Sequence, residues 1–227
     1  MYKCIQQLKQ DTPLEQNIFF SNLKQTNKKN NPCFSRKAFV AGQLDFLGAV
    51  TYFSFPMMQL CSRIQNFPAR WNILSNIIEE HGQGSFAQTH KATFTAFLQQ
   101  IGIGTTTIEN HTYHPCIDIF NHTLHSICQS AHPYVGIACL GIIEDRFSEI
   151  SFQIGSFLID AKWVQPEHLQ HYTTHKELDI LHADDFYSII SPHWDTHSKD
   201  IKKGLQIGNY LLLHLYEQLY EIHQHKI

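Results

Sequence analysis

Apolar residues recur every three to four positions along most of the chain, and the two-residue alternation of strands is missing between turn signals. This period predicts an all-α protein. We expect a bundle of about seven helices, over residues 37–65 with a bend near Pro56, 68–81, 85–101, 114–130, 133–160, 166–190 and 199–224. Pro68, Pro115, Pro133 and Pro166 each stand near an expected helix start, where the fixed φ and missing N–H of proline are favourable. Short loops between such helices are typical of a bundle.

The N-terminal residues 1–32 interrupt this pattern, because they are polar and include the run KQTNKKNN. We expect them to form a lead-in that packs on or flanks the bundle, and residues 33–227 to form a single domain. Hydrophobic residues make up 43% of the chain, and sixteen residues are Phe. Such a composition supports a large apolar core.

Charge and cysteine usage narrow the class of protein. A formal net charge of −3 offers no basic surface for nucleic acid. The six cysteines are widely spaced without a C-x-x-C pair, and no apolar N-terminal run resembles a signal peptide. The most apolar stretch, YVGIACLGII, ends at Glu144 and is too short to span a membrane. We therefore expect reduced thiols, no membrane span and a cytoplasmic location, with secretion as an effector as the alternative that the sequence leaves open.

Sixteen histidines are many for a chain of 227 residues, and four groups that can bind metal fall in the run HYTTHKELDILHADDFY. At about 100° per residue, these groups share one helical face, and that face continues into Phe186. The four groups are His171, His175, Asp179 and His182. A stripe that runs into apolar residues is expected to point into the bundle. It therefore favours a metal site or a proton-transfer site over a solvated polar face.

The spacing H-x3-D-x2-H favours two metal ions over one. His175 and His182 are expected to lie roughly 10 Å apart along the helix axis, with Asp179 between them. Two nitrogen ligands so separated fit a pair of adjacent metals better than one closed tetrahedral site. The remaining ligands must then come from other helices.

Three further residues are candidate ligands. Glu144 interrupts the most apolar helix beside Phe147, and an unpaired buried carboxylate is costly. It should therefore be protonated, bound to metal, or paired with Arg146 or a lysine. Glu80 ends a helix before the break HGQG, and His90 opens the next helix on an apolar face. The E-x-x-H signature of ferritin-like proteins is absent, so a two-metal site would belong to another type of bundle.

These groups, in this order, resemble those of a known family. The runs EEHGQG, FAQTHKATF, GIIEDRF and HKELDILH are similar to motifs of the haem-oxygenase-like diiron oxidases and oxygenases, and most closely to their CADD-like branch (chlamydial protein associating with death domains). The resemblance covers roughly residues 30 to 190. It implies a haem-oxygenase-like fold, shared with the TenA and PqqC proteins, and two irons that use O2 as co-substrate. The six ligands that it implies are Glu80, His90, Glu144, His175, Asp179 and His182.

One ligand of this family has no counterpart in the chain. Many members carry a seventh ligand, a Glu on the first long helix, where this chain reads TYFSFP and offers Thr51 or Ser54. Manganese, or a mixed iron and manganese pair, is therefore the alternative metal content. The CADD-like branch is associated with making p-aminobenzoate from one of its own tyrosines, but that tyrosine falls at Phe34 here. Tyr52 and Tyr172 are the nearby tyrosines that remain.

The resemblance implies an enzyme that oxidises a small metabolite, such as an amino acid, an amine or a carboxylic acid. The residues expected around the ligands, as pocket walls or behind them, are Tyr52, Phe94, Phe147, Phe152, His171 and Tyr172. Two alternatives stay open. A metal-free enzyme of the TenA or PqqC type could use Cys139 as its nucleophile, and a death-domain-type interaction protein would have no catalytic role.

Two other features carry less weight. The tail helix has apolar residues that could cover the bundle and form a homodimer seam, namely Leu211, Tyr216, Leu219 and Tyr220. A second histidine cluster could indicate another metal site, but no acidic residue shares its helical face, so we assign it no role. Its members are His111, His114, His122 and His125.

Overall fold

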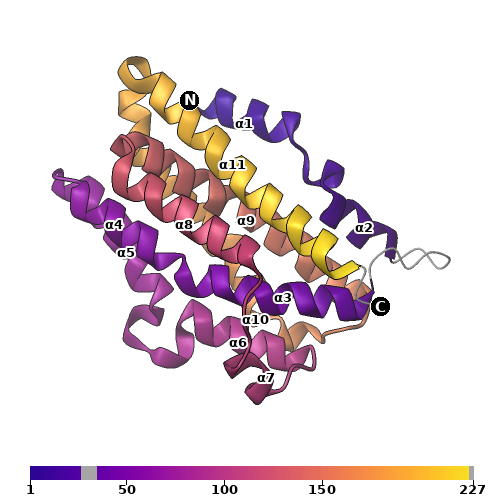
Figure 1. Ribbon diagram of the computed structural model, residues 1–227. Coiled ribbons are helices and arrows are strands. Elements are labelled where there is room, and N and C mark those ends of the chain that lie inside the picture. The colour runs from indigo at the N-terminus through magenta and orange to yellow at the C-terminus, as the bar shows by residue number, and fades with distance from the viewer. Residues whose placement is uncertain (27–34, 225–227) are drawn as a thin grey trace.

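The computed structural model describes residues 1–26 and 35–224, and these form helices without a strand (Figure 1). The α-helices are α1 (Tyr2–Asp11), α2 (Ile18–Thr26), α3 (Arg36–Tyr52), α4 (Ser54–Arg63), α5 (Phe67–Glu80), α6 (His90–Gln100), α7 (Thr105–Glu109), α8 (Pro115–Ser130), α9 (Pro133–Asp160), α10 (Gln170–Ile190) and α11 (Trp194–Gln224). Short 3-10 turns lie at Leu14–Gln16, Gly82–Gly84, Phe86–Gln88, Pro166–His168 and Ser191–His193. The prediction of an all-α chain is confirmed.

The predicted segments correspond to α3 with α4, and to α5, α6, α8, α9, α10 and α11. The bend expected near Pro56 instead falls at Phe53, between α3 and α4. Proline cannot donate to the carbonyl four residues earlier, here Tyr52, and its ring crowds that carbonyl, so the helix breaks about one turn before it. The sequence did not predict α1, α2 and α7.

Side-chain caps fix where several helices begin. Ser35, Asn66 and Thr89 each accept a hydrogen bond from a backbone N–H in the first turn of α3, α5 and α6. His114 and His132 do the same through Nδ1 for α8 and α9, ahead of a proline in the first turn. These bonds satisfy donors that a helix start otherwise leaves unpaired. The cap at Thr89 makes His90 the first residue of α6.

Helix α9 lies at the centre of the bundle, and α10 and α11 pack along it (Figure 1). The approach of α11 is close because Gly204 and Gly208 face the α9 backbone, where an added Cβ would collide with the carbonyls of Val135 and Cys139. Nearly every residue from Val135 to Ile143 is buried. The most apolar stretch of the sequence is thus the core helix of the bundle.

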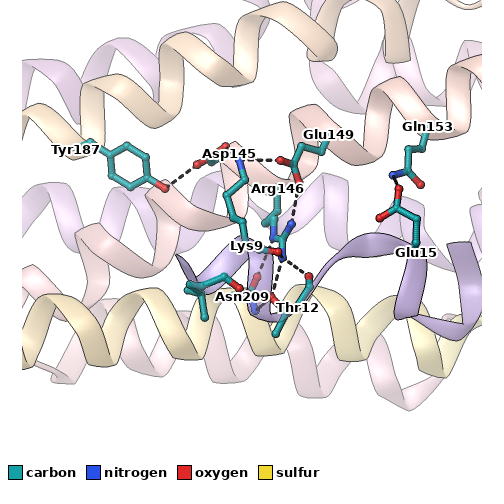
Figure 2. Close-up of polar contacts among 10 residues, drawn as sticks. Lys9, Thr12, Glu15, Asp145, Arg146, Glu149, Gln153, Tyr187 and Asn209 are labelled. Carbon is teal, nitrogen blue, oxygen red and sulfur yellow. Dashed lines mark hydrogen bonds and ion pairs between the residues drawn. The ribbon is translucent and has the colours of Figure 1, made fainter. Parts of the chain in front are cut away.

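The N-terminal helices are joined to this core through Arg146 of α9, which is 2% exposed (Figure 2). Its guanidinium donates to Asn209 Oδ1, Glu149 Oε2 and Thr12 Oγ1, each at 2.8 Å, and also to the Thr12 carbonyl. Lys9 of α1 pairs with Asp145 of α9 at 2.5 Å. The first helix is therefore held by charged groups of the central helix. The domain boundary expected between residues 32 and 33 lies outside the described residues and stays a prediction.

The tail helix faces inward. Tyr216 and Leu219 are fully buried and Tyr220 is 5% exposed, while Leu211 is half-buried. The Tyr216 ring packs on those of Phe19 and Phe20 from α2. These α11 residues cover the bundle, as expected, because α11 packs against α2, α3 and α9. The homodimer stays a prediction.

Among the described residues, one stretch is long and apolar enough to cross a membrane by length and composition alone. It is Arg36–Arg63, which includes α3 and α4, with a mean hydropathy of 1.2. Of its most apolar window, 61% is buried inside the protein. The core helix of a bundle passes the same test, so the stretch is weak support for a span.

Asp45 of α3 joins three parts of the chain. Its Oδ1 accepts hydrogen bonds from His111 Nε2 at 2.7 Å and from the His114 backbone N–H at 3.0 Å. Its Oδ2 accepts one from His223 Nε2 of α11 at 2.7 Å. The carboxyl is 2% exposed. The histidines that the sequence grouped together therefore have separate roles, since His125 contacts the Tyr52 hydroxyl at 3.1 Å instead.

Replacing this carboxylate should change how stability depends on pH. Burial alone would raise the pKa of Asp45, but hydrogen bonds from His223, His111 and the His114 backbone outweigh burial and lower it. A carboxyl whose pKa folding lowers stabilises the fold above its ordinary pKa, and this stabilisation is lost as pH falls through the lowered value. We expect Asp45→Asn to cost about 2 kcal/mol of unfolding free energy near pH 6.

Urea unfolding of wild type and variant between about pH 6 and pH 3 measures this effect. The difference in unfolding free energy between the two proteins should become smaller as the pH falls. The exposed Asp160→Asn change is the matched control, and its unfolding free energy should differ little from that of wild type at every pH. A gap for Asp45→Asn that stays constant over this range would contradict the assignment.

Candidate metal centre

The six predicted ligands come together from four helices. Glu80 is the last residue of α5, His90 the first of α6, and Glu144 lies midway along α9. The α10 ligands occupy one face of that helix. None of the six residues is more than 8% exposed. The α10 ligands are His175, Asp179 and His182.

The turn after α5 brings two of these ligands together. Gly82, Gln83 and Gly84 all have positive φ, of 66°, 52° and 90°. A side chain at Gly82 would collide with the backbone of the segment that leads into α6, so glycine is required there. The chain therefore reverses tightly, and His90 Nδ1 lies 2.7 Å from Glu80 Oε2.

The α10 ligands meet Glu144 in the interior. His175 Nδ1 lies 2.7 Å from Asp179 Oδ1, and the His175 and His90 ring centroids are 4.3 Å apart. His182 Nδ1 lies 3.8 Å from Glu144 Oε1 and 4.0 Å from Asp179 Oδ1. Donor atoms of Glu80, Glu144 and His182 all lie within 4.8 Å of one another. Such a group is compact enough to hold a metal ion.

Several donor atoms of this cluster have no hydrogen-bond partner among the described residues. They are Glu144 Oε1, Asp179 Oδ2 and His182 Nδ1. The described ion pairs of the three carboxylates involve histidines and no Lys or Arg. In particular, Arg146 binds the N-terminal segment, so it does not neutralise Glu144. Buried polar atoms without partners are costly, and the donor set therefore fits a divalent cation.

Burial and neighbouring charges shift the pKa of each of the three carboxylates. Burial raises the pKa of Glu144 to about 7, with Asp179 and Glu80 adding to the rise and His182 opposing it. Burial also raises the pKa of Asp179 well above its usual value. For Glu80, burial would raise the pKa, but the neighbouring His90 outweighs burial and lowers it. The cluster without metal thus holds protons that a bound cation would replace.

A small apolar cavity of about 50 Å³ adjoins the ligands Glu80, His90, Glu144 and His175. Phe147 and His171 lie in its wall, as expected from the sequence. The other wall residues, which the sequence did not reveal, are Phe46, Ala49, Val50, Phe53, Phe120, Ile143 and Leu212. Apolar side chains therefore form most of the wall of the cavity beside the ligands.

Phe94 and Tyr172 lie behind this wall. The Phe94 ring centroid is 4.8 Å from that of His171 and 6.3 Å from that of Tyr172. The buried Tyr172 hydroxyl donates a hydrogen bond to Gln43 Oε1. Both side chains thus lie behind the cavity wall without lining it.

Two expected pocket residues lie elsewhere. Phe152 is 53% exposed, with the Lys176 ammonium 5.0 Å from its ring centroid, because eight residues turn it roughly 80° away from the face of Glu144. Tyr52 faces α8, where its ring stacks on Phe55 and its hydroxyl meets His125. The break after α3 turns Phe53 to the cavity in place of Tyr52. Both predictions are wrong.

The interpretation of Cys139 as a possible nucleophile is also wrong. It is 0% exposed and packs in the interface of α9 with Gly208 of α11, outside the cavity wall. Burial raises the pKa of its thiol well above the ordinary value. The nucleophilic form is the thiolate, so this position opposes the metal-free alternative that depends on Cys139.

Glu79 lies at the site although it was not among the predicted site residues. His182 Nε2 lies 3.3 Å from Glu79 Oε2, and the Glu79 side chain is 27% exposed. If the ring donates Nε2–H to this carboxylate, its Nδ1 lone pair faces Glu144 and Asp179. A carboxylate that orients a metal-binding imidazole in this way is common in metal sites. The paired glutamates at the end of α5 were the signal available in the sequence.

Residues 46–210 match the model of a family described as iron-containing redox enzymes. The chain belongs to this family. All six candidate ligands lie within the matched residues, as does Glu79. Membership in the iron-containing redox enzyme family makes the protein an oxidoreductase in kind and gives iron as the metal that the family name suggests.

Solved structures share the fold at low sequence identity. A domain of unknown function with a heme oxygenase-like fold from Shewanella denitrificans has a TM-score of 0.76 at 11% identity, over 98% of this chain and 93% of that one. A TenA homolog from Pseudomonas syringae has a TM-score of 0.72 at 13% identity, over 95% and 92%. A TenA family transcription regulator from Silicibacter gives 0.68 at 9%, over 96% of each chain. The expected haem-oxygenase-like fold is confirmed. No curated protein matches the sequence.

Glu144→Met should separate the cost of the buried carboxylate from its role as a ligand. In the metal-free protein, this substitution replaces a buried carboxylate that has no bound cation with an apolar side chain of similar length. The unfolding free energy of the variant should therefore equal that of wild type or exceed it by about 1 kcal/mol. Added Fe(II) at about 100 times its Kd should stabilise wild type by about 2.7 kcal/mol, and the variant far less.

Anaerobic thermal unfolding with and without Fe(II) measures both effects. Glu177→Met, an exposed change on α10, is the control that should keep the full response to the metal. A large loss of stability in metal-free Glu144→Met, with the Fe(II) response intact, would contradict the assignment.

Proposed function

We propose that the protein is an iron-dependent oxidase or oxygenase that activates O2 at a non-haem diiron centre to oxidise a small metabolite. The observation that carries the proposal is the buried cluster of three carboxylates and three imidazoles, whose unpartnered donor atoms converge without a Lys or Arg. Iron with manganese, or manganese alone, is the alternative content for the same ligands.

Six residues would hold the two metals. Glu80, Glu144 and His182 offer donors close enough for one ion, and the other three donors lie beside them. Those three are His90, His175 and Asp179. Carboxylate and imidazole ligands suit Fe(II), which supplies the electrons for reducing O2 when bound.

The protein's own groups would prepare the surroundings of this reaction. The aromatic and aliphatic wall keeps water from the cavity, which protects reactive oxygen species from side reactions with solvent. The cavity of about 50 Å³ admits a molecule as small as O2, so a larger metabolite needs movement of the wall. Phe53 stands at the break between α3 and α4, where such a movement is least hindered by helix hydrogen bonds.

The central test is metal loading followed by O2 uptake. Wild type loaded anaerobically with Fe(II) should retain about two equivalents of iron after desalting and consume O2 on mixing. His182→Ala should retain less iron and consume O2 at a rate near that of free Fe(II). A wild-type protein that retains only a few tenths of an equivalent would refute the proposal.

Glu79→Gln should weaken metal binding without abolishing it. Loss of a carboxylate that orients a metal-binding imidazole typically costs about 10- to 100-fold in metal affinity. Competition with a chelating indicator measures the Fe(II) affinity of the variant. Glu177→Gln, on the exposed face of α10, is the control and should match wild type. Equal affinity of Glu79→Gln and wild type would show that the contact with His182 has no such role.

A further inference from the structure

We propose that His171 is a seventh metal ligand, through its Nε2 atom; this inference rests on the proposed function. His171 lies one turn before His175 on the α10 face that also carries Asp179 and His182. It is 2% exposed and lines the cavity shared by Glu80, His90, Glu144 and His175. A further buried imidazole thus lines the same cavity as four of the six ligands.

The hydrogen bonds around His171 indicate which nitrogen is available. Thr93 Oγ1 donates its single proton to the His90 carbonyl at 3.1 Å. The same oxygen lies 3.1 Å from His171 Nδ1, and with its own proton on the His90 carbonyl it can only accept a hydrogen bond from that nitrogen. In a neutral imidazole, the lone pair is then on Nε2. That atom is buried without a hydrogen-bond partner among the described residues.

The ring is also held in place by its neighbours. Its centroid lies 4.3 Å from that of His175 and 4.8 Å from that of Phe94, on α6. Together with the bond to Thr93, these contacts restrict how the imidazole can turn. A ligand whose orientation is fixed before the metal arrives binds at a lower entropic cost.

Helix α3 leaves room for such a ligand, because it brings no acid to the cavity. Its residues there are Phe46, Ala49 and Val50, followed by Phe53 in the break. Asp45 is the one acidic residue of α3, and His111 and His223 already bond to its oxygens. A nitrogen donor from α10 would therefore supply the coordination that a carboxylate from α3 does not.

Mn(II) titration followed by electron paramagnetic resonance tests the inference, because free and bound Mn(II) give different signals. His171→Phe keeps an aromatic ring in the cluster beside Phe94 but removes both nitrogens. Its neighbour Tyr172→Phe is the matched control, since it also loses one polar atom from a buried aromatic ring on α10. Circular dichroism and thermal unfolding of both variants verify that each is folded.

We expect wild type and Tyr172→Phe to bind two Mn(II) ions, and His171→Phe to bind one of them at least about 10-fold more weakly. The bound-Mn(II) spectrum of His171→Phe should also differ from that of wild type. Two ions bound by His171→Phe with wild-type affinity and spectrum would overturn the inference and leave the two-metal centre standing. Equal losses in both variants would overturn it as well, because the effect would then be one of packing. No binding of Mn(II) or Fe(II) by wild type would instead overturn the proposed function.

Discussion

The bundle has to accommodate three buried carboxylates that pair with no lysine or arginine among the described residues. Isolated buried charges are among the costliest groups in a protein, so the surrounding structure must hold their imidazole partners within a few ångströms. The left-handed turn after α5, the Thr89 cap of α6 and the tight packing of α9 all contribute to this placement. The free energy that burial of these carboxylates costs is offset by packing in the large aromatic and aliphatic core.

Local periodicity was enough to predict most of the fold and the inward face of α10, because a helix's own spacing decides which of its residues share a face. The contacts between helices could not be predicted in the same way. Arg146 was a plausible partner for Glu144, but its partners come from Thr12, 134 residues away, and from Asn209. Phe152 was misplaced because, eight residues after Glu144, it lies roughly 80° away from that ligand around the helix, on a face of α9 that is exposed there.

The same fold serves proteins with very different roles, as the TenA neighbours show, so the arrangement of helices cannot decide the chemistry. The side chains at the centre of the bundle determine which chemistry the protein can support. A buried thiol away from the cavity and a converging set of oxygen and nitrogen donors argue for metal-dependent oxidation over metal-free catalysis. The family match agrees with this direction.

The anchoring of α1 by Arg146 has a consequence for the order in which the chain folds. The first helix leaves the ribosome long before residues 146 and 209 exist, so during synthesis it must wait for most of the chain. Contacts over such separations form late and slow the folding of a domain. Completion of the bundle, and with it closure of the interior around Glu144, therefore requires that α11 has been synthesised and has packed.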